Sequence, residues 1–195
     1  IVNGEALRRA GLLSGAVPVV EGGEVMLDAG GVPTGVLIDN ACGLVSSIIP
    51  PHPEPRRLEA LMEAQANLLA HGIVGVTDAG LSPAEIERID ALQQSGILKL
   101  RVNALVSASD DNIAWLVDSG RRIEDMLVVN GVKFYMDGAL GSRGALLRQP
   151  YSDRTGWFGL ATQREQEFKR QIETLHGHGL QAATHCIGDS ATALV

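Results

Sequence analysis

The fold class follows from residues 56–108, which read RRLEALMEAQANLLAHGIVGVTDAGLSPAEIERIDALQQSGILKLRVNALVSA. Apolar residues in the first part recur at helical spacing, at positions 58, 61, 62, 68 and 69. They predict an amphipathic helix that ends at Gly72, followed by a short apolar strand at 73–77. A second helix begins after Ser82, a residue type that caps helix N-termini, and ends at Gly96. This stretch therefore predicts helices and strands that alternate.

The alternation continues toward the end of the chain. Further strands are expected at 97–108, within MLVVNGVKFYMDG (centred on 132–136) and at 180–188, and further helices at 110–120 and 162–179. An aspartate is the expected cap of the first of these helices, and Thr162 with Glu165 has the spacing of a capping box in the second. Apolar strands that alternate with amphipathic helices indicate a parallel sheet with crossover helices. The chain is thus predicted to be α/β, and periodicity alone fits an open sheet and a closed barrel equally well.

The N-terminal part, residues 1–55, lacks this rhythm. EVML and GVLID read as the two arms of a β-hairpin, with Ala29-Gly30-Gly31 supplying the turn. The proline-rich segment PPHPEP is an extended connector to the βα repeats of residues 56–195. Because the sequence begins without methionine and stops in GDSATALV, we expect it to be an internal piece of a longer protein.

The composition is that of a globular protein with a sizeable core, since 45% of the residues are hydrophobic and 20% are charged. The net charge is −7 and no basic patch is visible, so neither nucleic acid nor an anionic membrane is an expected partner. No apolar run approaches the roughly 18–20 residues of a membrane span. The two cysteines, Cys42 and Cys186, lack zinc-type spacing and indicate a reducing compartment, so we expect a cytoplasmic protein.

Functional side chains of parallel α/β proteins gather where strands end, and Lys133 lies near such an end. Period 2 places it on the same strand face as Tyr135 and Asp137. A buried lysine is costly unless it is paired or loses its charge. Reaction with CO₂ would remove the charge and give a carbamate that bridges two metal ions. The alternatives are a lysine that reaches solvent at the strand end and an ion pair with Asp137.

His185 ends another predicted strand and leads into a glycine turn. This position suits a metal ligand or a general acid/base, and a structural histidine is the alternative. The glycine-rich loop 138–161 is long, and such loops are often functional. Within it, Arg143 is the candidate for contact with substrate, and a surface arginine is the alternative.

Several segments resemble one known family. The run VKFYMDGALGSRGALLRQPYSDRTGWFGL, followed by HCIGDSA, is similar to the N-substituted formamide deformylase-like branch of the amidohydrolase superfamily. Members of that branch show a run similar to VK-x-x-x-DG-x-LGSR, then PY-x-D, then H-x-x-GD-x-A. The segments VNGEALRRAGL, GGEVMLDAGGVPTGVLIDNA and HGIVGVTDAG also resemble it, so the similarity covers nearly the whole chain.

The resemblance implies part of a (β/α)₈ barrel and hydrolysis of amide or other C–N bonds of a small molecule by metal-activated water. It implies that Lys133, carbamylated at the end of barrel strand four, and His185 on strand five bind one or two divalent metal ions, with zinc expected. Asp137 and Arg143 then lie beside the site as catalytic residues, and residues 1–50 form an insertion near the substrate entrance. An oligomer is compatible with the sequence.

The H-x-H pair of the family's first barrel strand, its later histidine and the aspartate of its last strand are not found in this chain. Because zinc takes about four ligands, we expect these residues alone to be inactive and poor in metal. A second hypothesis is a non-catalytic α/β binding module in which Lys133 and His185 are structural. A third, an open-sheet cofactor enzyme, has only LGSRG in its favour, because GxGxxG and GxxxxGK[ST] are both absent.

Overall fold

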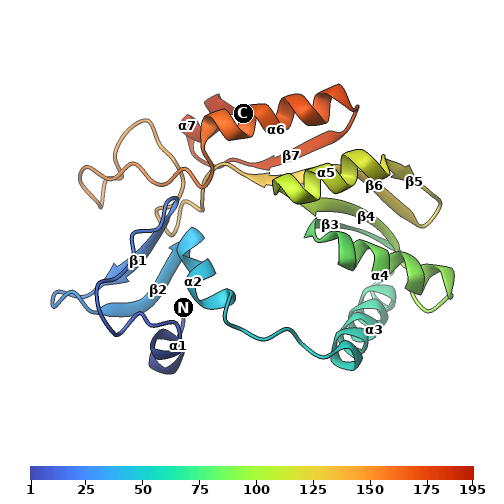
Figure 1. Ribbon diagram of the computed structural model, residues 1–195, viewed down its shortest axis with the longest axis horizontal. Coiled ribbons are helices and arrows are strands. Elements are labelled where there is room, and N and C mark those ends of the chain that lie inside the picture. Colours follow the sequence, from blue (N-terminus) through green and yellow to red (C-terminus); the bar gives the residue numbers. More distant parts are fainter. The chain divides into compact units, whose positions relative to one another are not determined.

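The computed structural model describes residues 1–195, which form two compact units (Figure 1). The first, here called the loop unit, comprises 1–51, 135–165 and 185–195. The second, here called the sheet unit, comprises 52–134 and 166–184. This division differs from the predicted segments 1–55 and 56–195, because the glycine-rich loop and the last residues group with the N-terminal part.

The sheet unit is built from alternating helices and strands. Three of these elements have one terminal residue that belongs to the loop unit. Its elements are α3 (Glu54–Ala70), β3 (Gly75–Leu81), α4 (Pro83–Gln94), β4 (Arg101–Ser107), α5 (Asp110–Ser119), β5 (Arg122–Ile123), β6 (Leu127–Tyr135), α6 (Glu165–Gly177) and β7 (Gln181–His185). The strand order is β3-β4-β6-β5, and β7 also pairs with β6. Strand β3 is parallel to β4 and β4 is parallel to β6, whereas the short β5 is antiparallel to β6. The predicted parallel sheet is confirmed.

One face of the sheet carries the apolar core. Val106 of β4 and the β6 residues Val129, Val132 and Phe134 are completely buried. Phe134 packs edge-on against Phe168 of α6, with ring centroids 5.5 Å apart and an angle of 87° between the ring planes. Burial of such side chains contributes about 1.5–3 kcal/mol each. Successive side chains of a strand point to opposite faces of the sheet. Lys133, which lies between Val132 and Phe134, is therefore on the other face of β6.

Helix α3 has the predicted amphipathic pattern, yet none of its residues is fully buried. It is fastened by Gln65, which accepts a hydrogen bond from the Lys99 amide and donates one to the Ile97 carbonyl. Strand β3 is an edge strand, since β4 is its one neighbour in the sheet. None of the helices, α3 included, combines the length and apolar character needed to cross a bilayer.

The predicted start of α4 is confirmed as a complete capping box. The Ser82 hydroxyl oxygen accepts from the Glu85 amide, and the Glu85 carboxylate accepts from the Ser82 amide at 2.8 Å. The hydrogen bonds that the Ser82 amide and hydroxyl donate to the Glu85 carboxylate hold the pKa of Glu85 below its usual range, against an opposing effect of burial.

Two other predicted caps are wrong. Ser109, not an aspartate, caps α5, and its hydroxyl oxygen accepts from the Asn112 amide. Helix α6 begins at Glu165, so Thr162 is not its cap. The Thr162 hydroxyl instead donates to the Tyr135 carbonyl, a long-range partner that local spacing could not reveal.

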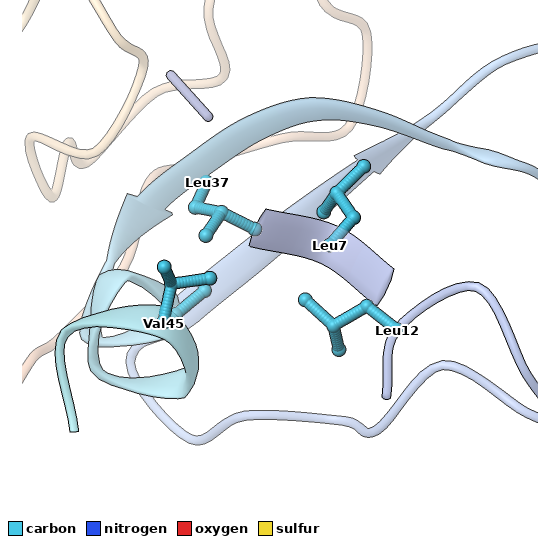
Figure 2. Packing of buried hydrophobic residues seen from close by; sticks show 5 residues of the cluster. Leu7, Leu12, Leu37 and Val45 are labelled. Carbon is cyan, nitrogen blue, oxygen red and sulfur yellow. The ribbon is translucent and has the colours of Figure 1, made fainter. Parts of the chain in front are cut away.

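The loop unit contains the predicted hairpin and a small core of its own. Its elements are α1 (Gly4–Arg9), β1 (Gly23–Leu27), β2 (Pro33–Asp39), η1 (Asn40–Cys42), α2 (Gly43–Ser46) and α7 (Asp189–Leu194). Strands β1 and β2 are antiparallel, and the Asp28 carboxylate accepts two backbone hydrogen bonds within their turn. Figure 2 shows the apolar cluster beside the hairpin, which consists of Leu7, Leu12, Leu37, Ala41 and Val45.

Candidate functional site

His185 is the last residue of β7 and is held on one side of its ring. The Met136 amide donates to the His185 carbonyl at 2.9 Å, which fixes the backbone at the strand end. The imidazole Nε2 lies 3.9 Å from the Asp137 carboxylate and 3.5 Å from the Gly138 carbonyl oxygen. The Tyr135 ring lies beside the imidazole, with centroids 5.6 Å apart. With 29% of its side chain exposed, His185 remains accessible to a ligand.

Asp137 is 1% exposed and accepts three backbone hydrogen bonds. Its Oδ2 accepts from the amides of Leu146 and Gly188, both at 2.8 Å, and its Oδ1 accepts from the Ile187 amide at 2.9 Å. The carboxylate therefore ties the loop after β6 to the turn after β7. Charge-assisted hydrogen bonds of this kind are strong and directional. Asp137 thus fixes the surroundings of His185.

Arg143 lies in the glycine-rich loop and forms a bidentate ion pair with Asp153, at 2.6 and 3.1 Å. The pair lowers the pKa of Asp153 and raises the pKa of Arg143. Arg143 has a positive φ of 60°, and its carbonyl accepts from the Trp157 indole. Both members of the pair line a cavity of about 410 Å³, together with Leu140, Gly141, Leu147, Pro150, Tyr151 and Ser152. The cavity offers a small molecule an apolar wall and a charged pair.

Lys133 lies in the sheet unit, half-buried near the end of β6. Its register partner on β4 is Ser107, and its Nζ donates to the Phe134 carbonyl at 3.2 Å. Lys133 lies on β6, which pairs with β7, the strand that ends at His185. No group of three or more histidine, cysteine, aspartate or glutamate side chains able to hold a metal ion occurs in the chain.

Asp39, which the sequence pattern did not indicate as a site residue, also lies near Asp137 and His185. It ends β2, and its carboxylate lies against Gly138 and Gly144. Burial raises the pKa of Asp39, the nearby charge of Asp137 raises it further, and His185 opposes both effects. The signal that could have found it is its position as the polar last residue of the predicted strand GVLID.

The hairpin is fastened to the glycine-rich loop by polar contacts. The Arg154 guanidinium donates to both oxygens of Glu24, at 2.6 and 2.7 Å, and stacks 3.9 Å from the Trp157 ring. The Asn40 amide group donates to the Thr162 carbonyl at 3.0 Å. The two segments are far apart in sequence and form one unit because of these contacts.

The sequence model of the Amidohydrolase family matches residues 1–195. The amidohydrolase-family protein YtcJ of Bacillus subtilis (strain 168) is 30% identical over 97% of this chain, and the Arabidopsis thaliana protein LONG AFTER FAR-RED 3 is 29% identical over all of it. The chain spans only 36% and 35% of the length of these two relatives.

Two solved structures have the same fold over 98% of the chain. They are uncharacterized metal-dependent hydrolases from Pyrococcus horikoshii OT3, with a TM-score of 0.67, and Pyrococcus furiosus, with a TM-score of 0.72. Each is 26% identical to this chain, which covers 38% and 39% of them. They confirm the predicted fold class, a partial (β/α)₈-like arrangement. Because the family match extends over every residue, the chain belongs to the Amidohydrolase family.

Proposed function

We propose that this chain is part of a cytoplasmic, metal-dependent hydrolase that cleaves amide or other C–N bonds of small molecules, in the N-substituted formamide deformylase-like branch of its family. The observation that carries this proposal is the setting of His185, whose Nε2 faces a carboxylate and a carbonyl oxygen at a strand end. The two solved hydrolases described as metal-dependent support it.

The ring of His185 fits a metal ligand. Metal-binding histidines commonly donate the N–H of their second nitrogen to a carboxylate or a backbone carbonyl. The Gly138 carbonyl lies within hydrogen-bond distance of Nε2, at 3.5 Å, and the Asp137 carboxylate lies 3.9 Å away; together they favour the proton on that nitrogen. The lone pair of Nδ1 is then available to an ion. Lys133, as a carbamate, would add an oxygen ligand from the strand that pairs with β7.

A bound divalent ion, for which we propose zinc, would polarise the scissile carbonyl and lower the pKa of a water molecule. The protein residues around it have separate roles. Asp137 positions His185 and the two loops, and we assign it this role instead of the predicted catalytic one because both its oxygens already accept backbone hydrogen bonds. Arg143 and Asp153 line the cavity in which a polar part of the substrate would be oriented.

The test replaces the two proposed ligands in the longest natural chain that carries residues 1–195. We expect Lys133→Ala and His185→Ala each to lower the bound metal, measured by elemental analysis, and to abolish hydrolysis of a panel of amides. Lys99→Ala and His178→Ala are matched controls, since both residues are exposed and precede β4 and β7, away from the carboxyl ends of these strands. Full activity and full metal content in both test variants would contradict the proposal.

The contacts of Lys133 with the Phe134 carbonyl and of His185 with Gly138 and Asp137 favour a second candidate function, in which both residues are structural. A non-catalytic α/β binding module predicts that the same full-length protein carries no metal and hydrolyses neither amides nor esters. The two measurements above separate these functions directly.

A further inference from the structure

The ion pair of Arg143 and Asp153 leaves one edge of the guanidinium unused. Nε and Nη2 of Arg143 donate to the two carboxylate oxygens of Asp153, whereas Nη1 donates to no group of the chain. An arginine has more N–H donors than a single bidentate pair uses, so the Nη1 edge can bind a second acceptor. The side chains are 37% exposed for Arg143 and 58% exposed for Asp153, so a ligand can reach both charged groups.

The backbone of Arg143 is held in a strained conformation. Its φ of 60° lies in the left-handed region, which residues with long side chains rarely adopt. Two contacts enforce this conformation: the Arg143 amide donates to the Leu140 carbonyl at 3.0 Å, and the Arg143 carbonyl accepts from the Trp157 indole at 2.8 Å. Strain of this kind collects at ligand-binding sites. The fold therefore fixes the backbone that carries this guanidinium at the cavity.

The remainder of the cavity wall is mainly apolar. Leu140, Leu147, Pro150 and Tyr151 line it beside the ion pair. The Tyr151 hydroxyl is already used, since it donates to the Ala145 carbonyl at 2.9 Å. The volume of about 410 Å³ lies within the range of small-molecule sites. The cavity thus combines an apolar wall with one exposed pair that contains both a donor and an acceptor.

A short series of contacts joins this cavity to the candidate site. Gly144, the residue after Arg143, accepts at its carbonyl from the Gly138 amide at 3.2 Å. The Gly138 carbonyl in turn lies 3.5 Å from Nε2 of His185. The cavity is therefore part of the same loop structure that surrounds the histidine to which we assign the metal.

We propose that this cavity binds an uncharged amide group of the substrate, whose carbonyl accepts from Nη1 of Arg143 and whose N–H donates to Asp153. An anion in this place would meet the charge of Asp153, and a cation would meet the charge of Arg143, whereas an amide supplies one acceptor and one donor. The inference rests on the proposed function. It narrows the substrates to molecules that carry an apolar group and an uncharged amide beside the bond that is hydrolysed.

The test uses three probes that share one apolar body and differ in the charge of the head group: isovaleramide, isovalerate and isopentylammonium. Ligand-observed NMR on the longest natural chain that carries residues 1–195 gives their dissociation constants, and the same spectra show any hydrolysis of isovaleramide. We expect the wild type to bind isovaleramide about tenfold more tightly than either ion, the effect of one hydrogen bond to a charged group.

Removal of either charge should move the preference to an ion. Asp153→Asn leaves Arg143 without its counter-charge, so isovalerate should become the tightest ligand. Arg143→Asn leaves Asp153 without its counter-charge, so isopentylammonium should become the tightest, and asparagine tolerates the positive φ at this position. Arg148→Asn, an exposed change in the same loop outside the cavity, is the control and should alter none of the three constants.

Equal binding of the three probes by the wild type, no binding of isovaleramide, or an unchanged preference in both variants would overturn the assignment. A variant that fails to fold cannot gain affinity for an ion, so the expected change of preference does not arise from unfolding. If the full-length protein hydrolyses no amide while the three probes bind as expected, the proposed hydrolysis fails and the assignment of the cavity stands.

Discussion

The contacts that stabilise the sheet unit internally differ from those that stabilise the loop unit. In the sheet unit, completely buried apolar side chains such as Val132 and Phe134 fill the face that carries α6. In the loop unit, backbone amides converge on Asp137, and Arg154 of the glycine-rich loop pairs with Glu24 of the hairpin. Apolar burial stabilises without specifying exact positions, whereas directional polar contacts place individual side chains. Asp137, Arg143 and His185 lie where the second kind is found, whereas Lys133 lies in the sheet unit.

Backbone strain follows the same division. Both non-glycine residues with a positive φ, Asp39 and Arg143, belong to the loop unit. Proteins commonly carry functional residues on loops that a rigid scaffold supports, at some cost in stability. The four predictions below test this difference between the units, beginning with the largest effect.

Phe134→Ala should break the sheet unit most severely. The side chain is completely buried against Phe168, so its truncation should cost about 3–5 kcal/mol in the free energy of unfolding. Urea denaturation followed by the fluorescence of Trp115, which lies in the sheet unit, measures the effect. Phe134→Leu, which preserves most of the volume, is the control and should cost much less. A loss below about 1 kcal/mol for the alanine variant would show that this core is not well packed.

Asp137→Ala should break the loop unit in a different way. Three backbone amides lose their acceptor, and the unmade hydrogen bonds should cost about 2–4 kcal/mol. Hydrogen exchange should speed up at Leu146 and Gly188, while amides of β4 and β6 keep their protection. Uniform acceleration across both units would mean that Asp137 supports the whole fold and does not act locally.

Ser82→Ala sharpens the comparison by removing a polar contact from the sheet unit. The capping box at the start of α4 loses its hydroxyl, which should cost about 1 kcal/mol. Ser119→Ala, an exposed position at the other end of a neighbouring helix, should leave the unfolding midpoint in urea unchanged. If the cap proves as costly to remove as Phe134, the distinction between apolar and polar stabilisation does not hold.

The smallest expected effect is a pH dependence from Asp39. Burial, and then the charge of Asp137, raise the pKa of this carboxyl above its ordinary value of 3.8, although His185 opposes them. The folded state therefore holds the proton more tightly than the unfolded state, so the contribution of Asp39 to stability is full below 3.8 and is lost as pH rises through the raised pKa. Unfolding of wild type and Asp39→Asn between pH 4 and pH 7.5 should show the variant gaining relative stability as pH rises. A constant difference would contradict a raised pKa.

Much of the sheet unit was predictable from local patterns. Apolar spacing located α3 and the strands, and Ser82 marked the start of α4. Errors arose where a long-range partner outweighed a local signal, as when the Thr162 hydroxyl bonds to Tyr135 instead of capping α6. Each local pattern depends only on a few neighbouring residues. It can therefore predict a helix or a strand, but it contains no information about contacts with distant residues.

The candidate site was predictable only in part. Lys133 and His185 are predicted site residues because parallel strands end at one edge of a sheet, and the structure has them near the ends of β6 and β7. The role of Asp137 could not be read from spacing, since its donors come from the separate segments that contain Leu146 and Gly188. The place of these residues in the reaction stays a prediction until the variants are measured.

The amino-acid sequence by itself determined the alternation of helices and strands, the hairpin and the strand-end candidates, because each depends on periodicity or turn chemistry within a short stretch. The tertiary structure alone decided that Asp39, from the hairpin, lies beside Gly138 and Gly144 with an unsatisfied oxygen. The physical reason is that burial and hydrogen bonding of a polar group depend on what the folded chain brings around it, and residues about 100 positions apart bring it here.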